Sequence, residues 1–169
     1  MLIASIAIFL TGVQMNLKDS LQKIPVTHVN LSFYIETEKG TKVRAVLDKM
    51  RASHRKCALV MDHGKLTGIF TERDIVAKVA SKGDVLKKPI EDLMTPSPIT
   101  MVSTLTVVEA SRLIASTPHR YIPVVNDEGV VLGTVTYYAI IKYISDYFPQ
   151  EIYNLPPVPD LFATARDGA

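Results

Sequence analysis

The chain contains one cysteine, no tryptophan and almost no excess of either charge. A lone cysteine, Cys57, excludes a disulfide framework and a metal site built from several cysteines. Because Cys57 opens the apolar run 57–61, we expect a buried, unreactive thiol. The net charge is only +2, from 19 basic and 17 acidic residues. Nucleic acid is therefore not expected as a partner, since neutralising many phosphates requires a large positive field.

Motifs of catalysis and metal binding are also missing. The four histidines, at 28, 54, 63 and 119, do not have the spacing of a metal site, and neither a nucleophile elbow nor a phosphate loop occurs. With 169 residues, the chain is too short for a regulatory module and a separate catalytic domain. The sequence thus predicts a non-catalytic protein that requires no metal.

The two ends of the chain differ from its centre. Residues 1–13 are apolar and uncharged, but they are too short to span a bilayer and lack the basic residue that opens a secretory signal. We expect 1–23 to form a packed apolar segment or helix, with a membrane-associated peptide as the alternative. Residues 148–169 contain several prolines and predict an extended strap or a frayed end. The predicted location is cytoplasmic, with membrane contact not expected.

The central part of the chain contains a repeat. Residues 54–60 (HRKCALV) are echoed by 119–125 (HRYIPVV), and 68–75 (GIFTERDI) by 133–140 (GTVTYYAI). Both pairs have the same offset of 65 residues. The landmarks therefore occur twice in the same order, as in a duplicated structural unit.

Each copy also predicts the same secondary structure. Apolar residues at helical spacing cover 43–50 and 107–114, and turn-forming clusters at 62–65 and 126–129 separate two apolar runs. A second helix is expected to begin at Thr71 and at Thr136. One copy is too small to bury much surface, so two should pack sheet to sheet. The predicted class is α+β, with β-α-β-β-α repeats over 24–82 and 88–147 related by a pseudo-two-fold axis.

These motifs together resemble the CBS-domain pair, or Bateman module. The resemblance rests on 92–100 (DLMTPSPIT), on the strand 122–125 (IPVV) and on the Gly-x-x-Thr-x-x-Asp pattern of 68–74, and it covers residues 24–147. Two departures are visible. The lead-in of the first copy, 26–34, lacks the Met-Thr-x-x-Pro form of the second, and Ala139 stands where the second copy would have the aspartate.

The resemblance implies that Thr71 and Asp74 hold the ribose of a nucleotide. A carboxylate suits this task because it accepts hydrogen bonds from two neighbouring hydroxyls. The alternative is structural: Thr71 caps the second helix and Asp74 completes a capping box. Thr136 keeps the cap position in the second copy without an acid at Ala139, so capping alone does not demand an aspartate.

The other ligand contacts are implied by the same resemblance. His119 and Arg120 would reach the phosphates, or else form a solvated basic helix end. Ile99 and Thr100, with Ile122 and Pro123, would supply an apolar slot for adenine, or simply belong to the core.

A second cleft would contain His54, Arg55 and Thr136. Because it lacks the aspartate, we expect it to bind more weakly or to stay empty.

The implied ligand is an adenine nucleotide (AMP, ADP or ATP), with S-adenosylmethionine or NAD as alternatives. Binding between the repeats would change the association with an unknown protein partner. The resemblance also implies a homodimer, for which the helical faces 43–50 and 107–114 are candidate contacts. The alternative function is a ligand-free dimerisation or interaction module.

Overall fold

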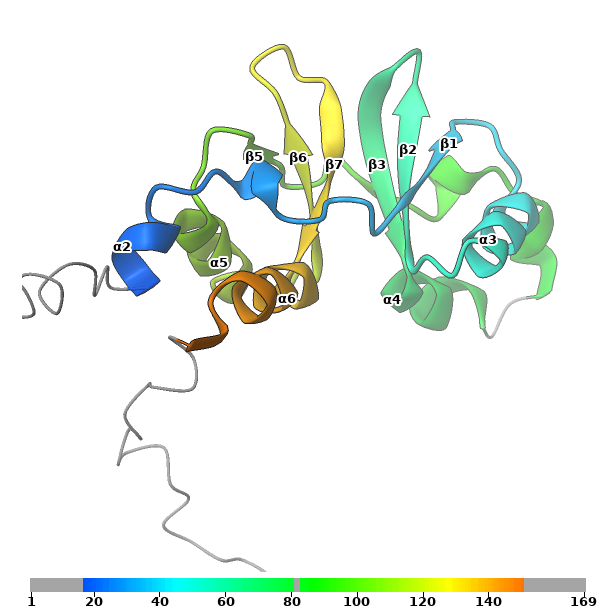
Figure 1. The fold of residues 1–169 in the computed structure, drawn as a ribbon. Coiled ribbons are helices and arrows are strands. Elements are labelled where there is room, and N and C mark those ends of the chain that lie inside the picture. The colour runs from blue at the N-terminus through cyan, green and yellow to red at the C-terminus, as the bar shows by residue number, and fades with distance from the viewer. Residues whose placement is uncertain (1–16, 81–82, 151–169) are drawn as a thin grey trace, which may run out of the picture.

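The structure, a computed structural model, describes residues 17–80 and 83–150 and consists of two similar units side by side (Figure 1). The first unit contains β1 (Ile35–Glu38), α3 (Val43–Ala52), β2 (Cys57–Asp62), β3 (Lys65–Thr71) and α4 (Glu72–Asp74), which continues as a π-helix over Ile75–Val79. The second contains β5 (Met101–Val102), α5 (Val107–Ala115), β6 (Tyr121–Val125), β7 (Val131–Thr136) and α6 (Tyr137–Tyr147). This order confirms the predicted pair of β-α-β-β-α repeats.

Shorter elements lead into each unit. Helix α2 (Leu17–Leu21) and a 3-10 helix over Val26–His28 precede the first. Two 3-10 helices (Gly83–Lys87 and Ile90–Asp92) and the short strand β4 (Thr95–Pro96) precede the second. Most of the predicted N-terminal segment and most of the predicted C-terminal tail lie outside the described residues, and none of the described helices is long and apolar enough to cross a membrane.

Each unit has its own mixed sheet. The strand orders are β1-β2-β3-β4 and β5-β6-β7, in which β1 and β2, and likewise β5 and β6, run parallel while the other pairs are antiparallel. The register shifts between Val60 and Met61 in β2 and between Val124 and Val125 in β6. The irregularities thus fall at matching places in the two repeats, as expected for duplicated strands.

Helices α3 and α5 cover one face of their sheets and are held there by the apolar stripes seen in the sequence. Val43 and Val46 are at most 1% exposed, and so are Val107 and Ala110. The prediction that these faces form a dimer contact is wrong, because they are already buried in the core of their own unit. Thr106 begins α5 and accepts a hydrogen bond from the Glu109 N–H at 3.3 Å, which satisfies one free donor of the first turn.

The two cores are completed by an exchange of lead-in segments. The core of the second unit includes Leu21, Val26 and Val29, from the segment that precedes the first unit. The core of the first unit includes Ile90 and Leu93, from the segment that precedes the second. Figure 1 shows α2 beside α5 and the chain then crossing to β1. The predicted first repeat, 24–82, includes Val26 and Val29, which pack in the core of the second unit, while Leu21 falls in the predicted segment 1–23.

Matching backbone hydrogen bonds hold the exchanged segments in place. The Val26 N–H donates to the Leu105 carbonyl and the Val107 N–H to the Ile24 carbonyl, both at 2.8 Å. In the other unit, the Ile90 N–H donates to the Thr41 carbonyl at 2.8 Å and the Val43 N–H to the Lys88 carbonyl at 2.9 Å. The exchange is therefore built into the backbone of both units.

A third apolar cluster joins the two sheets. It contains Cys57, Leu59 and Ile69 of the first unit, packed against Tyr121 and Val131 of the second. Burial raises the pKa of the Cys57 thiol, and the neighbouring Asp74 carboxylate acts in the same direction. The two sheets therefore pack against each other through this cluster, in agreement with the predicted sheet-to-sheet packing.

Candidate ligand site

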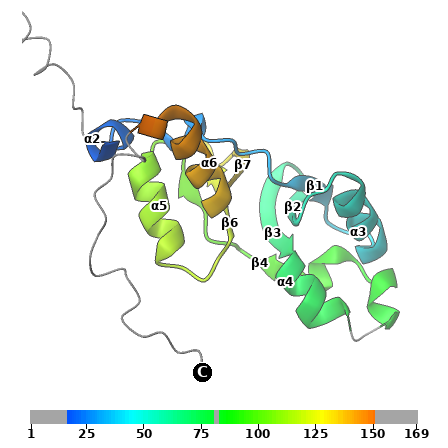
Figure 2. The ribbon, with the colours of Figure 1, turned by 60° about the horizontal axis from the view of Figure 1, so that its bottom comes forward.

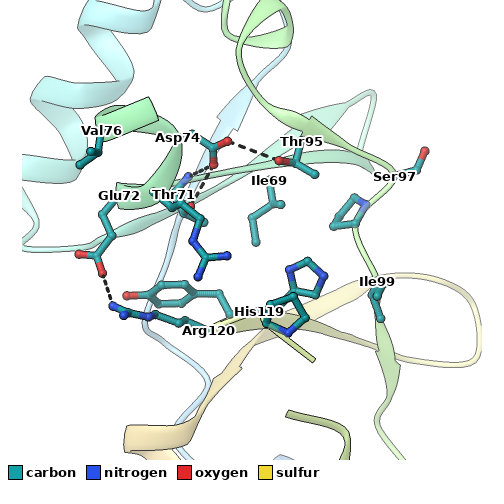
Figure 3. A pocket seen from close by; sticks show the side chains of 14 residues that line it. Ile69, Thr71, Glu72, Asp74, Val76, Thr95, Ser97, Ile99, His119 and Arg120 are labelled. Carbon is teal, nitrogen blue, oxygen red and sulfur yellow. Dashed lines mark hydrogen bonds and ion pairs between the residues drawn. The ribbon is translucent and has the colours of Figure 1, made fainter. Parts of the chain in front are cut away.

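A cavity of about 610 Å³ lies where the two units meet, between the start of α4 and the segment before β6 (Figure 3). The first unit contributes the end of β3, α4 and Val76, the lead-in to the second unit contributes 95–99, and the second unit itself contributes 118–121. Five of the predicted ligand residues line it: Thr71, Asp74, Ile99, His119 and Arg120. Side chains from repeats that are distant in sequence thus converge on one space of ligand size.

Asp74 is the buried acid of this cavity, with a residue exposure of 8%. One carboxylate oxygen, Oδ2, accepts hydrogen bonds from the N–H and the hydroxyl of Thr71, both at 2.9 Å. The other, Oδ1, lies 2.7 Å from the Lys78 ammonium and accepts a long hydrogen bond of 3.4 Å from the Thr95 hydroxyl. Asp74 therefore completes the capping box at the start of α4, which is the structural alternative that the sequence left open. Its Oδ1 borders the cavity near Thr95 (Figure 3).

Arg120 lies on the opposite side of the cavity and is paired with an acid from the other repeat. Its guanidinium nitrogen is 3.2 Å from Oε1 of Glu72. The second oxygen of Glu72 is 3.4 Å from the Lys56 ammonium. The Arg120 side chain is 74% exposed, so its donors can be reached from the cavity. His119 also lines this space.

The remaining wall is largely apolar. It includes Ile69, Val76, Pro98 and Ile99, with the ring of Tyr121. Val76 is 73% and Ile99 50% exposed, although neither side chain can hydrogen-bond to water. Burial, followed by the nearby Glu72 carboxylate, raises the pKa of the Tyr121 phenol. The cavity thus offers apolar surface for a flat group, a carboxylate on one side and a guanidinium on the other.

Three of the predicted residues line neither this cavity nor the second one described below. Ile122 and Pro123 lie in the centre of β6, where the Ile122 side chain is 0% exposed in the core of the second unit. Thr100 is exposed and follows Ile99, which does line the cavity. Ile122 thus belongs to the core, which is the alternative that the sequence left open.

A second cavity of about 820 Å³ lies beside the first, and its lining includes His54, Arg55 and Thr136. The Arg55 guanidinium stacks over the Phe33 ring, 5.5 Å from its centroid. The Thr136 hydroxyl accepts a hydrogen bond from the Ala139 N–H at 3.0 Å and caps α6. This cavity therefore keeps the cap, while Ala139, which is 2% exposed and does not line it, stands at the sequence position that Asp74 has in the first repeat.

The two cavities share part of their lining. Glu72, Pro118, His119, Arg120 and Tyr121 belong to both. The Glu72–Arg120 ion pair consequently stands at their junction. Among the residues 17–80 and 83–150, no cluster of three or more His, Cys, Asp or Glu side chains could hold a metal ion.

Sequence reasoning did not find several lining residues. In the first cavity these are Ile69, Glu72, Arg73, Val76, Thr95, Ser97, Pro98, Pro118 and Tyr121. Glu72 could have been noticed as a charged residue inside the Thr-x-x-Asp pattern. Its pairing with Arg120, 48 residues later, could not be predicted from the spacing of neighbouring residues.

Two β-α-β-β-α repeats that pack sheet to sheet beside two clefts define a tandem-repeat α+β fold. The CBS domain family matches residues 34–81 and 90–146, so this chain belongs to the CBS domain family and contains a pair of its domains. The resemblance seen in the sequence is confirmed.

Curated relatives contain the same pair as one part of longer proteins. The meiotically up-regulated gene 70 protein of Schizosaccharomyces pombe is 28% identical over 112 residues, which is 66% of this chain and 15% of that protein. The L-aspartate semialdehyde sulfurtransferase of Methanocaldococcus jannaschii is 35% identical over 120 residues, 70% of this chain and 21% of that protein. The chain thus spans less than half the length of the curated relatives it matches.

Solved structures share the fold. One is CBSX2 in complex with AMP, with a TM-score of 0.57, 24% identity and coverage of 73% of this chain and 92% of that one. Another is the cytosolic domain of the Mg²⁺ channel MgtE in complex with ATP, with a TM-score of 0.60, 21% identity and coverage of 74% and 50%. Both structures were solved in complex with an adenine nucleotide.

Proposed function

We propose that this CBS pair is a non-catalytic regulatory module that binds an adenine nucleotide (AMP, ADP or ATP) in the first cavity. The observation that carries the proposal is the convergence of Asp74 and Arg120 on one space, from two different repeats. Ribose hydroxyls need an acceptor and phosphates need a donor fork, and these two side chains supply both. The AMP complex of CBSX2 and the ATP complex of MgtE support the same ligand class.

The mechanism would be a change in the relative position of the two repeats. A ligand that contacts both sides favours the arrangement in which the contacts coexist, and it shifts the equilibrium by no more than its differential affinity. The Glu72–Arg120 ion pair joins the repeats at this point, so a ligand at Arg120 acts directly on an inter-repeat contact. A partner protein that recognises one arrangement would read the shift.

The second cavity is expected to bind the same ligand more weakly or not at all. Its lining includes His54 and Arg55, and Ala139 stands at the sequence position of the acid. S-adenosylmethionine and NAD remain alternative ligands for the first cavity, since both contain an adenosine ribose. No metal is required by this chemistry, and a cytoplasmic location stays a prediction.

A ligand-free dimerisation module is the second candidate function, and the surface of α6 favours it. Tyr138 is 62% and Ile141 53% exposed on this helix. Exposed apolar groups of this kind mark contact surfaces when they are adjacent. The expected homodimer is tested by sedimentation equilibrium, where Ile141→Lys should lower the mass to that of the 18.7 kDa chain.

The ribose contact is tested by titration calorimetry with AMP and 2′-deoxy-AMP. We expect 2′-deoxy-AMP to bind the unmodified protein about 10- to 100-fold more weakly, the range for a hydrogen bond to a charged group. In Asp74→Asn the preference should shrink to a few fold, because the charged acceptor is gone. Glu128→Gln, an exposed residue that lines neither cavity, is the control of equal charge change.

The panel of ligands should include ADP, ATP, NAD and S-adenosylmethionine, with thermal melting as a second readout. A ligand at a hundredfold excess over its dissociation constant stabilises the folded state by about 2.7 kcal/mol. A panel in which every melting midpoint stays unchanged would refute the nucleotide module and favour the ligand-free alternative. If Asp74→Asn discriminates between AMP and 2′-deoxy-AMP as strongly as the unmodified protein does, the ribose does not bind at Asp74.

A further inference from the structure

Glu72 is the acid at the junction of the two cavities, and in the scheme above it contacts neither the ribose nor the phosphate of the ligand. One of its oxygens lies 3.2 Å from the Arg120 guanidinium and the other 3.4 Å from the Lys56 ammonium. Its side chain is 36% exposed and lines both cavities. In Figure 3 the Glu72 carboxylate points at the Arg120 side chain along the edge of the cavity. The guanidinium proposed to meet a phosphate is thus already paired with an anion of the protein.

We propose that Glu72 is a built-in competitor for the phosphate, and that it sets how many phosphates an adenosine ligand of the first cavity can carry. This inference rests on the proposed function, which it deepens by naming the ligand class: nucleosides and nucleotides of low negative charge, with AMP preferred over ATP. Each phosphate that approaches Arg120 must either displace Glu72 or stand next to it.

The charge balance of the cavity supports this selectivity. Its lining contains two carboxylates, Glu72 and Asp74, and two guanidiniums, Arg73 and Arg120, so their formal charges cancel (2 − 2 = 0). His119 adds a positive charge only when it is protonated. A ligand with one phosphate can be met by Arg120 alone. Each further phosphate adds negative charge beside Glu72, in a lining whose formal charges already balance without it.

Geometry makes the competition direct. A carboxylate and a phosphate bind a guanidinium through the same N–H donors. A phosphate on Arg120 would release Glu72, whose other oxygen is already within reach of Lys56. Arg120 belongs to the second repeat and Glu72 to the first, so the exchange replaces a protein contact between repeats by a ligand contact.

The effect should be moderate because the pair is partly solvated. Exposed ion pairs contribute little, and their removal changes a binding constant by a factor of about two to five. We therefore expect Glu72→Gln to bind AMP about two- to fivefold more tightly and to gain more for ATP than for AMP. Adenosine, which has no phosphate to compete, should bind equally well to both proteins. The gain should fall at high ionic strength.

The experiment is calorimetric titration of the full chain with adenosine, AMP and ATP, at low salt and again at about 1 M sodium chloride, where screening is nearly complete. The proteins are the unmodified chain, Glu72→Gln, Lys56→Gln and the control Glu128→Gln, whose position lines neither cavity. A melting curve of each variant verifies folding. Glu128→Gln has the same charge change as Glu72→Gln, so it measures the long-range contribution alone. Lys56→Gln leaves Glu72 with Arg120 as its single partner and should weaken AMP binding.

The outcomes separate the two proposals. An affinity gain in Glu72→Gln that rises from adenosine to AMP to ATP, and is absent in Glu128→Gln, supports both. If adenosine and AMP bind but Glu72→Gln changes all three ligands equally or not at all, the competitor role is overturned while the nucleotide site stands. If none of the three ligands binds any of the proteins, the nucleotide site fails and the competitor role fails with it.

Discussion

The carboxylate of Asp74 and the ammonium of Lys78 lie 2.7 Å apart, one helical turn from each other. The same ammonium donates a hydrogen bond to the Leu93 carbonyl at 2.7 Å. Leu93 belongs to the lead-in of the second unit but is buried in the core of the first. Asp74 is thus connected through Lys78 to the exchanged segment, in addition to its bonds with Thr71.

Asp74 should contribute to stability even without a ligand. Replacement by alanine removes the acceptor for Thr71 at the start of α4 and leaves Lys78 with one partner fewer. We expect Asp74→Ala to lower the free energy of unfolding by about 1–2 kcal/mol, the range for loss of a helix cap. Urea denaturation measures the change, and Asp74→Asn should lose less because its amide oxygen still accepts. An unchanged midpoint for Asp74→Ala would mean that the cap contributes nothing.

The second cavity should gain a ribose acceptor through one substitution. Ala139 occupies the position of Asp74 in the other repeat, behind the same threonine cap. We expect Ala139→Asp to raise the AMP stoichiometry from one to two per chain, because Thr136 can orient the new carboxylate as Thr71 orients Asp74. Calorimetry gives the stoichiometry, and Ala139→Ser is the matched control without charge. A value of one in both variants would show that the missing acid is not what limits this cavity.

Thr134 should be destabilising where it stands. It is 0% exposed, and its hydroxyl has no hydrogen-bond partner within the described part of the chain. Valine has nearly the same shape without the polar atom, so Thr134→Val should raise the free energy of unfolding by about 1 kcal/mol. Thr67→Val is the control of opposite sign, since the Thr67 hydroxyl donates to the Val60 carbonyl at 3.0 Å. Equal effects of the two substitutions in urea denaturation would contradict the prediction.

The start of α5 should respond to acid. Hydrogen bonds from the Thr106 backbone N–H and, next, its hydroxyl lower the pKa of Glu109. A lowered pKa in the folded state means that Glu109 stabilises the fold above its unfolded value of about 4.3, and that this stabilisation disappears as the pH falls through the folded value. Thermal melting between about pH 6 and pH 3 should show a smaller decline for Glu109→Gln than for the unmodified chain. Parallel curves would contradict the assignment.

The helices and strands could be predicted because the sequence pattern of each one lies within a short window. The apolar stripe Val43–Met50, the turn clusters and the duplicated strands each lie within a short window, and each became the expected helix or hairpin. The exchange of lead-in segments could not be predicted, since an apolar residue such as Val26 indicates burial without naming the unit that buries it. The expected dimer faces failed for the same reason.

The residues of the candidate site likewise fall into those that a sequence pattern indicates and those that only the folded structure brings together. Thr71, His119 and Arg120 have counterparts in the other repeat, Asp74 completes the Gly-x-x-Thr-x-x-Asp pattern, and the structure gathers all four around one cavity. Ile122 and Pro123 were chosen for their apolar character, which does not say whether a side chain faces a ligand or the core. Glu72 was missed because its significance comes from Arg120, a neighbour only after folding.

Figure 2, turned from the view of Figure 1, shows the second unit assembled around α2 and α5, while β1 to β4 remain together in the other unit. The core of the first unit is drawn from Ile35 to Met94 without interruption, whereas that of the second needs Leu21 to Phe33 together with Met101 to Phe148. During synthesis, the core residues of the first unit are therefore all translated once Met94 has been added, whereas residues 21–33 are made before the residues that bury them. We expect the first unit to close before the second.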